Sequence, residues 1–149
     1  DIMIYDVSLQ TGNRALDVVL MEKGLFCKNH EIQWSCMVDG SRMNFMKAED
    51  IYGIFGNALD NAIEACEKNQ KEKRIVCRIN RETDEVNMFI ENNIEQSVLA
   101  GNPSLETTKQ KKDRHGMGHL IVEEQVKKLG GMVEYYEDKM FCAHVYLPV

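Results

Sequence analysis

The stretch FGNALDNAIEAC, residues 55–66, combines a strong helical pattern with two asparagines four residues apart. At 3.6 residues per turn, the apolar residues of this region fall on one arc, which predicts an amphipathic helix from about residue 48 to residue 68. The members of that arc are Ile51, Ile54, Phe55, Ala58, Leu59, Ala62, Ile63 and Cys66. Asn57 and Asn61 lie outside the arc and stack one turn apart, so a single ligand could contact both.

The paired asparagines admit two interpretations. Asparagine costs roughly 0.5 kcal/mol of helix propensity per site, so Glu, Lys or Arg would serve a solvated surface better. That cost favours a binding role for Asn57 and Asn61. The alternative at this point is that the two asparagines lie on a solvent-exposed face whose sequence drifted without a binding role.

The flanking sequence predicts one helix before this one and one after it. Thr11 or Asn13 can cap a helix that runs to about Glu22, and Gly24 is expected to stop it. The later helix is expected to end at the double glycine of residues 130–131.

Alternating apolar and polar residues predict strands around these helices. The strands cover residues 31–38, 74–80, 86–92, 132–137 and 140–148. Polar turns join the second strand to the third and the fourth to the fifth, which indicates two antiparallel hairpins. The predicted fold class is therefore α+β, with a mixed, mostly antiparallel sheet that about three helices cover on one face and a more polar face opposite.

The composition of the chain narrows its function. With 149 residues and 44% hydrophobic content, a single domain over residues 1–149 is expected. A net charge of -6 argues against a nucleic-acid surface, which needs a broad basic face. The five cysteines show no metal-ligand spacing and are expected to be buried thiols in a reducing cytoplasm. With no apolar run long enough to span a bilayer, membrane contact by this chain is not expected.

Residues 93–115 break every helical and strand period, which predicts a long polar loop. The loop leads into Gly116-Met117-Gly118, where the backbone can approach a ligand and the N–H groups of the following helix can bind an anion. Basic residues precede the glycines at Lys109, Lys111, Lys112, Arg114 and His115. In an acidic chain this pattern indicates a phosphate-binding lid. A tight turn and a solvated loop, both without a ligand, are the alternatives.

Phosphates at this loop would need a hard cation beside them. Mg²⁺ prefers oxygen ligands, keeps several waters and takes phosphate oxygens. The amide oxygen of Asn61 would supply one neutral ligand without cancelling the pull of the metal on the phosphates. Asn61 is therefore the candidate metal ligand.

These motifs resemble those of the GHKL ATPases, a superfamily that includes gyrase, the MutL mismatch-repair proteins, heat-shock chaperones and histidine kinases. Residues 57–62 (NALDNA) resemble the N box and residues 115–118 (HGMG) resemble the G2 box. The wording is most similar to the GHKL domain of quorum-sensing sensor histidine kinases, over most of residues 11–149. The resemblance implies a two-layer α/β sandwich, the Bergerat ATP-binding fold, with ATP between the N-box helix and the lid of residues 93–115.

The resemblance also implies roles for individual residues. Asn61 would hold Mg²⁺ and Asn57 would lie beside the phosphates, so both are the catalytic candidates. Asn92, at the end of a strand, would contact the adenine. The lid and the G2 box would complete the ATP site with Lys109, Lys112, His115, Gly116, Met117 and Gly118.

Three positions depart from the pattern of the family. The usual Asp-x-Gly-x-Gly adenine motif is missing, and an uncharged amide at Asn92 replaces its aspartate, so weaker nucleotide binding is expected. The Gly-Thr often found on the last strands is absent. Glu64 stands where many kinases carry a lysine.

The chemistry of Asn57 favours a kinase over an ATPase. An amide cannot take a proton from water, whereas the ATP-hydrolysing relatives place a glutamate base here. Phosphoryl transfer to a histidine needs no such base. None of the four histidines, His30, His115, His119 and His144, lies on an N-terminal helix pair suited to a phosphoacceptor.

We therefore expect the cytoplasmic catalytic half of a membrane-anchored kinase, which alone does not phosphorylate itself. Its partners would be ATP, the dimerisation domain of the same full-length protein and, indirectly, a response regulator. Because the chain begins with Asp1 rather than Met, residues 1–10 are expected to be the remnant of a linker. An anti-sigma-type serine kinase and a non-catalytic nucleotide-sensing or docking module are the alternatives.

Overall fold

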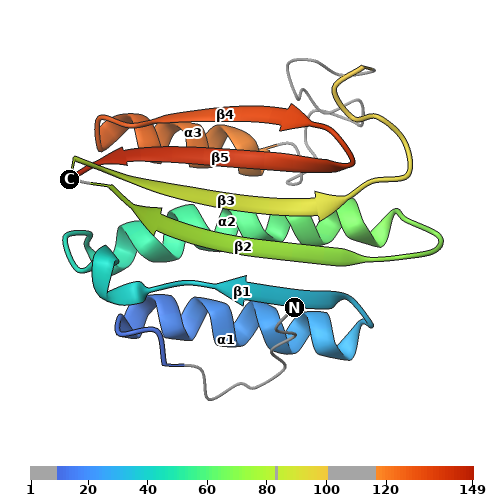
Figure 1. The fold of residues 1–149 in the computed structure, drawn as a ribbon, viewed down its shortest axis with the longest axis horizontal. Helices are drawn as coiled ribbons and strands as arrows, with labels where there is room; N and C mark the ends of the chain where they lie inside the picture. The colour runs from blue at the N-terminus through green and yellow to red at the C-terminus, as the bar shows by residue number, and fades with distance from the viewer. Residues whose placement is uncertain (1–9, 83, 101–116) are drawn as a thin grey trace.

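The computed structural model describes residues 10–82, 84–100 and 117–149, and these ranges form one five-stranded sheet with three α-helices and a short 3₁₀ helix (Figure 1). In chain order the elements are α1 (Arg14–Asn29), β1 (Gln33–Met37), η1 (Gly40–Met43), α2 (Ala48–Glu67), β2 (Arg74–Arg81), β3 (Glu85–Asn93), α3 (Met117–Lys128), β4 (Met132–Glu137) and β5 (Met140–Pro148). The predicted strands and helices are all present, and apart from the end of α1 their ends shift by only a few residues.

The sheet has the strand order β1-β2-β3-β5-β4. The β1–β2 pair is parallel, and the other three pairs are antiparallel. Helix α2 lies behind β2 and β3, α3 lies behind β4 and β5, and α1 packs beside β1 and α2 (Figure 1). This is the predicted α+β class, a mixed sheet with its helices on one face.

Helix α2 forms the centre of the core. All eight residues of the predicted apolar arc are buried in the structure. Phe55 and Leu59 are fully buried, and burial of each such side chain contributes about 1.5–3 kcal/mol to folding. The periodicity of residues 48–67 therefore fixes which face of α2 meets the sheet, and it leaves Asn57 and Asn61 beside that face.

Helix α1 differs from the prediction at its end. Asn13 is the cap, because its side chain accepts a hydrogen bond from the backbone N–H of Leu16 at 3.0 Å. The helix does not stop at Gly24 but continues to Asn29. Gly24 is buried, and a Cβ there would stand 3.3 Å from Nε1 of Trp34. This glycine therefore makes room for a tryptophan of β1 instead of ending the helix.

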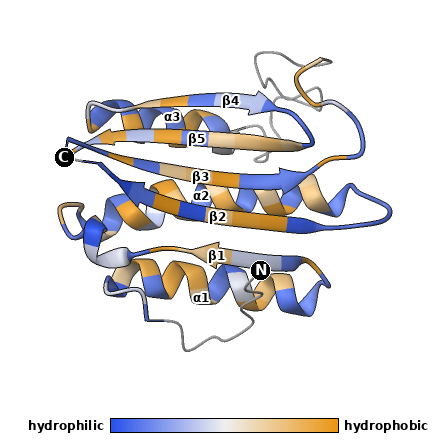
Figure 2. Cartoon of the chain, in the orientation of Figure 1, coloured by the Kyte–Doolittle hydropathy of each residue, from blue (hydrophilic) through white to orange (hydrophobic). Residues whose placement is uncertain are grey.

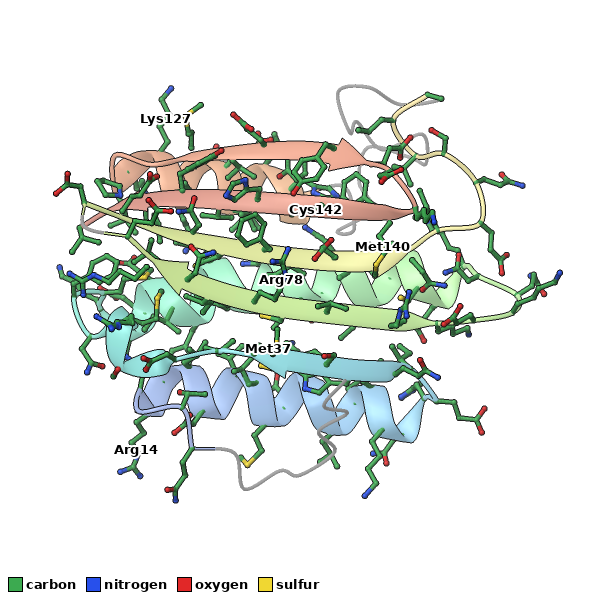
Figure 3. The ribbon with its side chains drawn as sticks, in the orientation of Figure 1. Arg14, Met37, Arg78, Lys127, Met140 and Cys142 are labelled. Carbon is green, nitrogen blue, oxygen red and sulfur yellow. The ribbon has the colours of Figure 1, made fainter. Side chains whose placement is uncertain are left out.

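The sheet face away from the helices is more polar than the core face, as predicted. Along β2, hydrophobic and hydrophilic bands alternate (Figure 2), and Arg78 stands on the open face (Figure 3). Its guanidinium lies 4.5 Å from the centroid of the Phe89 ring and 3.1 Å from a carboxylate oxygen of Glu91. The Phe89 ring stacks on His144 at 4.1 Å, and His144 Nε2 donates a hydrogen bond to the amide oxygen of Asn87 at 2.9 Å.

Several predictions fall partly or wholly outside the described residues. Of the predicted linker, residues 1–9 lie outside them. Of the predicted lid loop, Asn93 ends β3, residues 94–100 have no regular structure, and residues 101–115 lie outside the described residues.

The five cysteines are free and buried, as predicted. Among the described residues, no helix combines the length and the apolar character that a membrane span requires.

Candidate functional site

The predicted site residues lie where α2 meets α3 and where β3 ends. Asn57 and Asn61 are on α2, Asn92 is on β3, and Met117 and Gly118 open α3. The predicted ligands Lys109, Lys112, His115 and Gly116 lie outside the described residues. The structure thus brings together the helix of the paired asparagines and the start of the helix that follows the glycines.

A glycine of α2 makes room for a side chain of α3. Gly53 faces α3, and a Cβ at this position would collide with the side-chain amide of Gln125. The carbonyl oxygen of Gly53 also accepts a hydrogen bond from Asn57 Nδ2 at 2.7 Å. The amide nitrogen of Asn57 is therefore turned back onto its own helix, and within the described ranges its oxygen accepts no hydrogen bond.

Asn61 makes the direct link between the two helices. Its Nδ2 lies 3.4 Å from Nδ1 of His119, in the first turn of α3. An amide nitrogen only donates, so the imidazole nitrogen accepts in this contact. The amide oxygen of Asn61 has no hydrogen-bond donor among the residues that the structure describes. That oxygen is the group that a hard cation would use.

The imidazole of His119 is held from its other side. Its ring meets that of Tyr135 edge to face, with centroids 5.4 Å apart and planes at 87°. Tyr135 stacks on Phe141, with ring centroids 5.9 Å apart. Burial is the main cause that raises the pKa of the Tyr135 phenol, and the nearby Glu123 adds to it. Burial lowers the pKa of His119, which favours the neutral ring that can accept the bond from Asn61.

Two acidic residues on α2 have partners of their own. Asp60 forms a salt bridge with Lys23 of α1, with 2.6 Å between Nζ and Oδ1, so its carboxylate is directed toward α1. Glu64 also takes part in an interaction. Among the described residues, no group of three or more His, Cys, Asp or Glu side chains has the arrangement of a metal site.

Asn92 is the second-last residue of β3, on the side of the sheet that faces the helices. Its side chain is 2% exposed, and its Nδ2 donates to the carbonyl oxygen of Asn93 at 3.3 Å. The next residue, Asn93, accepts a bond from the thiol of Cys66 on α2 at 3.6 Å. Cys66 lies five residues after Asn61, which is about 7.5 Å along a helix axis. The end of β3 therefore borders the second half of α2, which contains Asn61.

The described start of the predicted lid is fixed by two carboxylates. Glu95 accepts hydrogen bonds from the backbone N–H groups of Gln70 and Lys71, at 2.9 Å and 2.8 Å. Glu137, at the end of β4, accepts from the side chain of Ser97 and from the N–H groups of residues 98 and 99. The hydrogen bond from Ser97 and those from the backbone hold the pKa of Glu137 below its usual range.

Sequence reasoning missed His119 and Glu137. It considered His119 only as a phosphoacceptor, and it had no signal that the end of the last hairpin would contact residues 97–99. A signal for His119 was present, since this polar ring directly follows the glycines and occupies the first turn of a predicted helix. Its partner Asn61 is 58 residues away in the chain, so only the packing of α2 on α3 identifies the pair.

A comparison with protein families matches residues 46–148 to the GHKL domain family. The matched segment begins just before α2 and extends through β5, so it contains both asparagines, Asn92 and all of α3. Among curated proteins, none matches the sequence of this chain.

Solved structures of histidine kinases share the fold. The catalytic domain of histidine kinase ThkA superposes with a TM-score of 0.71 at 15% identity, over 93% of both chains. A mycobacterial sensor histidine kinase, MprB, gives a TM-score of 0.63 at 17% identity, over 90% of this chain and 93% of the other. The blue-light activated histidine kinase EL346 of Erythrobacter litoralis gives 0.59 at 13% identity, and the match covers 91% of this chain but 39% of that one.

Proposed function

The chain belongs to the GHKL domain family, and on that premise we propose that it is the ATP-binding catalytic domain of a sensor histidine kinase. In this proposal it transfers the γ-phosphoryl group of Mg-ATP to a histidine on a separate dimerisation domain. A response regulator would be an indirect partner, reached through that dimerisation domain, and the reaction would take place in the cytoplasm. GHKL domains bind ATP, generally with Mg²⁺. The quorum-sensing subtype stays a prediction from the wording of the N-box helix.

One observation carries the proposal more than any other. Asn61 Nδ2 and His119 Nδ1 are 3.4 Å apart, so the asparagine helix and the first turn of α3 meet. A triphosphate gripped by amide oxygens on one helix and by backbone N–H groups at the start of another requires this meeting. If the asparagine helix and the start of α3 lay in separate parts of the fold, the same residues could not form such a site.

The residues present fit Mg²⁺ and ATP. The oxygen of Asn61 is a hard, neutral ligand, and the nearby carboxylate of Asp60 is already paired with Lys23. When bound, Mg²⁺ neutralises phosphate charge and ATP supplies the phosphoryl group. Asn61 would hold the cation, and Asn57 would lie beside the phosphates with its nitrogen fixed to the Gly53 carbonyl. Buried Asn92 would contact the adenine, with one donor and one acceptor available on its amide.

The geometry of Asn57 supports transfer rather than hydrolysis. Its nitrogen is engaged at 2.7 Å and its oxygen has no basicity at neutral pH, so it cannot activate water as a general base. Transfer to a histidine requires positioning and charge neutralisation, because imidazole is itself the nucleophile. We therefore expect slow ATP hydrolysis by this domain.

Asn92 favours a second candidate function, a nucleotide-binding module without catalysis. An amide that donates to Asn93 at 3.3 Å in place of a charged carboxylate weakens the hold on the adenine amino group. Such a domain would report nucleotide or dock a partner, and it would transfer nothing.

Calorimetric titration of the chain with ATP, with and without Mg²⁺, tests the shared premise. We expect Mg²⁺-dependent binding that Asn61→Ala weakens and that Asn80→Ala, an exposed control on β2, leaves unchanged. Phosphorylation of the histidine in the full-length protein then separates the two candidates. Binding without any transfer supports the nucleotide-sensing module, and no binding at millimolar ATP contradicts the kinase and favours a module that only docks a partner.

A further inference from the structure

The contact between Asn61 and His119 decides which end of the asparagine amide faces away from α3. The two ends of an asparagine amide have similar size, so packing alone does not select an orientation. A neutral histidine that presents Nδ1 as an acceptor selects the nitrogen end, at 3.4 Å. The oxygen is then left at the opposite end of the amide.

We propose that His119 is a positioning residue, which binds the nitrogen of Asn61 and thereby keeps the amide oxygen available to Mg²⁺. The inference rests on the proposed function, since it concerns the metal that accompanies ATP there. It assigns to α3 a side-chain role in addition to the backbone N–H groups at its start.

The surroundings of His119 make its orientation specific. The ring contacts Tyr135 edge to face at 5.4 Å and 87°, and Tyr135 is itself stacked on Phe141. These contacts come from β4 and β5, so the sheet fixes the ring and the ring fixes the amide. Loss of Nδ1 would remove the selection while the helix remained in place.

The expected effect follows from the strength of one hydrogen bond. A typical bond of this kind changes an equilibrium about three- to tenfold. Loss of the acceptor should therefore weaken the Mg²⁺-dependent part of ATP binding by about three- to tenfold. Binding of ATP without Mg²⁺ should not change, because that binding does not use the oxygen of Asn61.

Two substitutions separate positioning from packing. His119→Phe keeps a ring against Tyr135 and removes the acceptor. His119→Asn loses the ring but places Oδ1 at the same number of bonds from the backbone as Nδ1. If Mg²⁺ dependence requires the acceptor, it falls in the first variant and is retained in the second, with thermal unfolding of both variants as the check on folding.

The measurements are calorimetric titrations with ATP in Mg²⁺ and in EDTA, together with NMR of the Asn61 side-chain amide in the unliganded chain. We expect His119→Phe to shift the amide protons of Asn61 and to reduce binding in Mg²⁺ only. Equal loss in Mg²⁺ and EDTA, or no change in either signal, overturns the inference. Absence of ATP binding by the unmodified chain instead contradicts the proposed function, while the amide shift still reports whether the hydrogen bond exists.

Discussion

Substitution of Asn92 by aspartate tests the proposed adenine contact against the cost of burial. The Asn92 side chain is 2% exposed and uses its nitrogen to donate to the Asn93 carbonyl at 3.3 Å. An aspartate has no nitrogen to donate and would place a carboxylate against a carbonyl oxygen. Without nucleotide, Asn92→Asp should therefore destabilise the domain.

The size of this effect follows from the group that is left unpaired. A buried polar group without its hydrogen bond costs about 1–3 kcal/mol. Unfolding of a 149-residue chain carries an entropy of about 0.3 kcal/mol/K, so Tm should fall by about 3–10 °C. ATP should recover part of this loss, because a carboxylate accepts from the adenine amino group more strongly than an amide does. At a hundredfold excess over Kd, a ligand stabilises by about 2.7 kcal/mol, and each tenfold gain in affinity at fixed ATP adds about 1.4 kcal/mol.

Thermal unfolding with and without Mg-ATP measures both parts. The matched control is Asn87→Asp on the same strand, whose side chain is also buried but lies on the opposite face and pairs with His144 at 2.9 Å. We expect the control to keep its partner and to leave the ATP-induced rise in Tm unchanged. An Asn92→Asp variant with unaltered Tm refutes the burial argument. A smaller ATP-induced rise than in the unmodified chain refutes the adenine contact.

Three further predictions concern single residues of the fold. Gly56→Ala on α2 should raise the free energy of unfolding by about 1 kcal/mol in denaturant titrations, because no atom stands within 4 Å of the added Cβ. Gly131→Ala should lower the free energy of unfolding, because its Cβ would meet a backbone carbonyl of β5. Asn13→Ala should cost about 1–2 kcal/mol by the same measurement, because it removes the cap of α1. The hydrogen bonds of the Glu137 carboxylate should stabilise residues 97–99 above the ordinary carboxyl pKa, and this stabilisation should be lost as pH falls through the lowered pKa of Glu137. The loss should appear as faster hydrogen exchange at residues 98 and 99, after correction for intrinsic exchange rates.

Local pattern was sufficient to predict the elements, the two hairpins and the fold class, but it did not predict the strand order. The apolar arc of α2 appears in the sequence because helix period and burial act on the same residues, and it is buried as predicted. Hairpin turns and alternation likewise predict β2 with β3 and β4 with β5. The length of α1 could not be predicted, because the role of Gly24 depends on Trp34 of a separate strand. A glycine gives the same local signal whether it ends a helix or admits a neighbouring ring.

The candidate site was likewise predictable only in the features that local sequence pattern determines. The spacing of Asn57 and Asn61 identifies a polar pair on one helix, and the position of Asn92 at the end of a strand follows from alternation. What the pattern does not contain is the partner of each amide. Asn57 Nδ2 binds the Gly53 carbonyl and Asn61 Nδ2 binds His119, and only the second of these partners is distant in sequence.

Gly53 connects these two facts. Because Gly53 has no side chain, the side-chain amide of Gln125 on α3 can lie against α2, and His119 of the same helix contacts Asn61 two turns further along α2. Its carbonyl also takes the nitrogen of Asn57. Both amides are therefore oriented by their nitrogens, one through the backbone of α2 and one through α3, and both present oxygen as the remaining group. The contact between the two helices thus orients Asn61, which alone could be solvated surface, and leaves its oxygen for the cation that the proposed function requires.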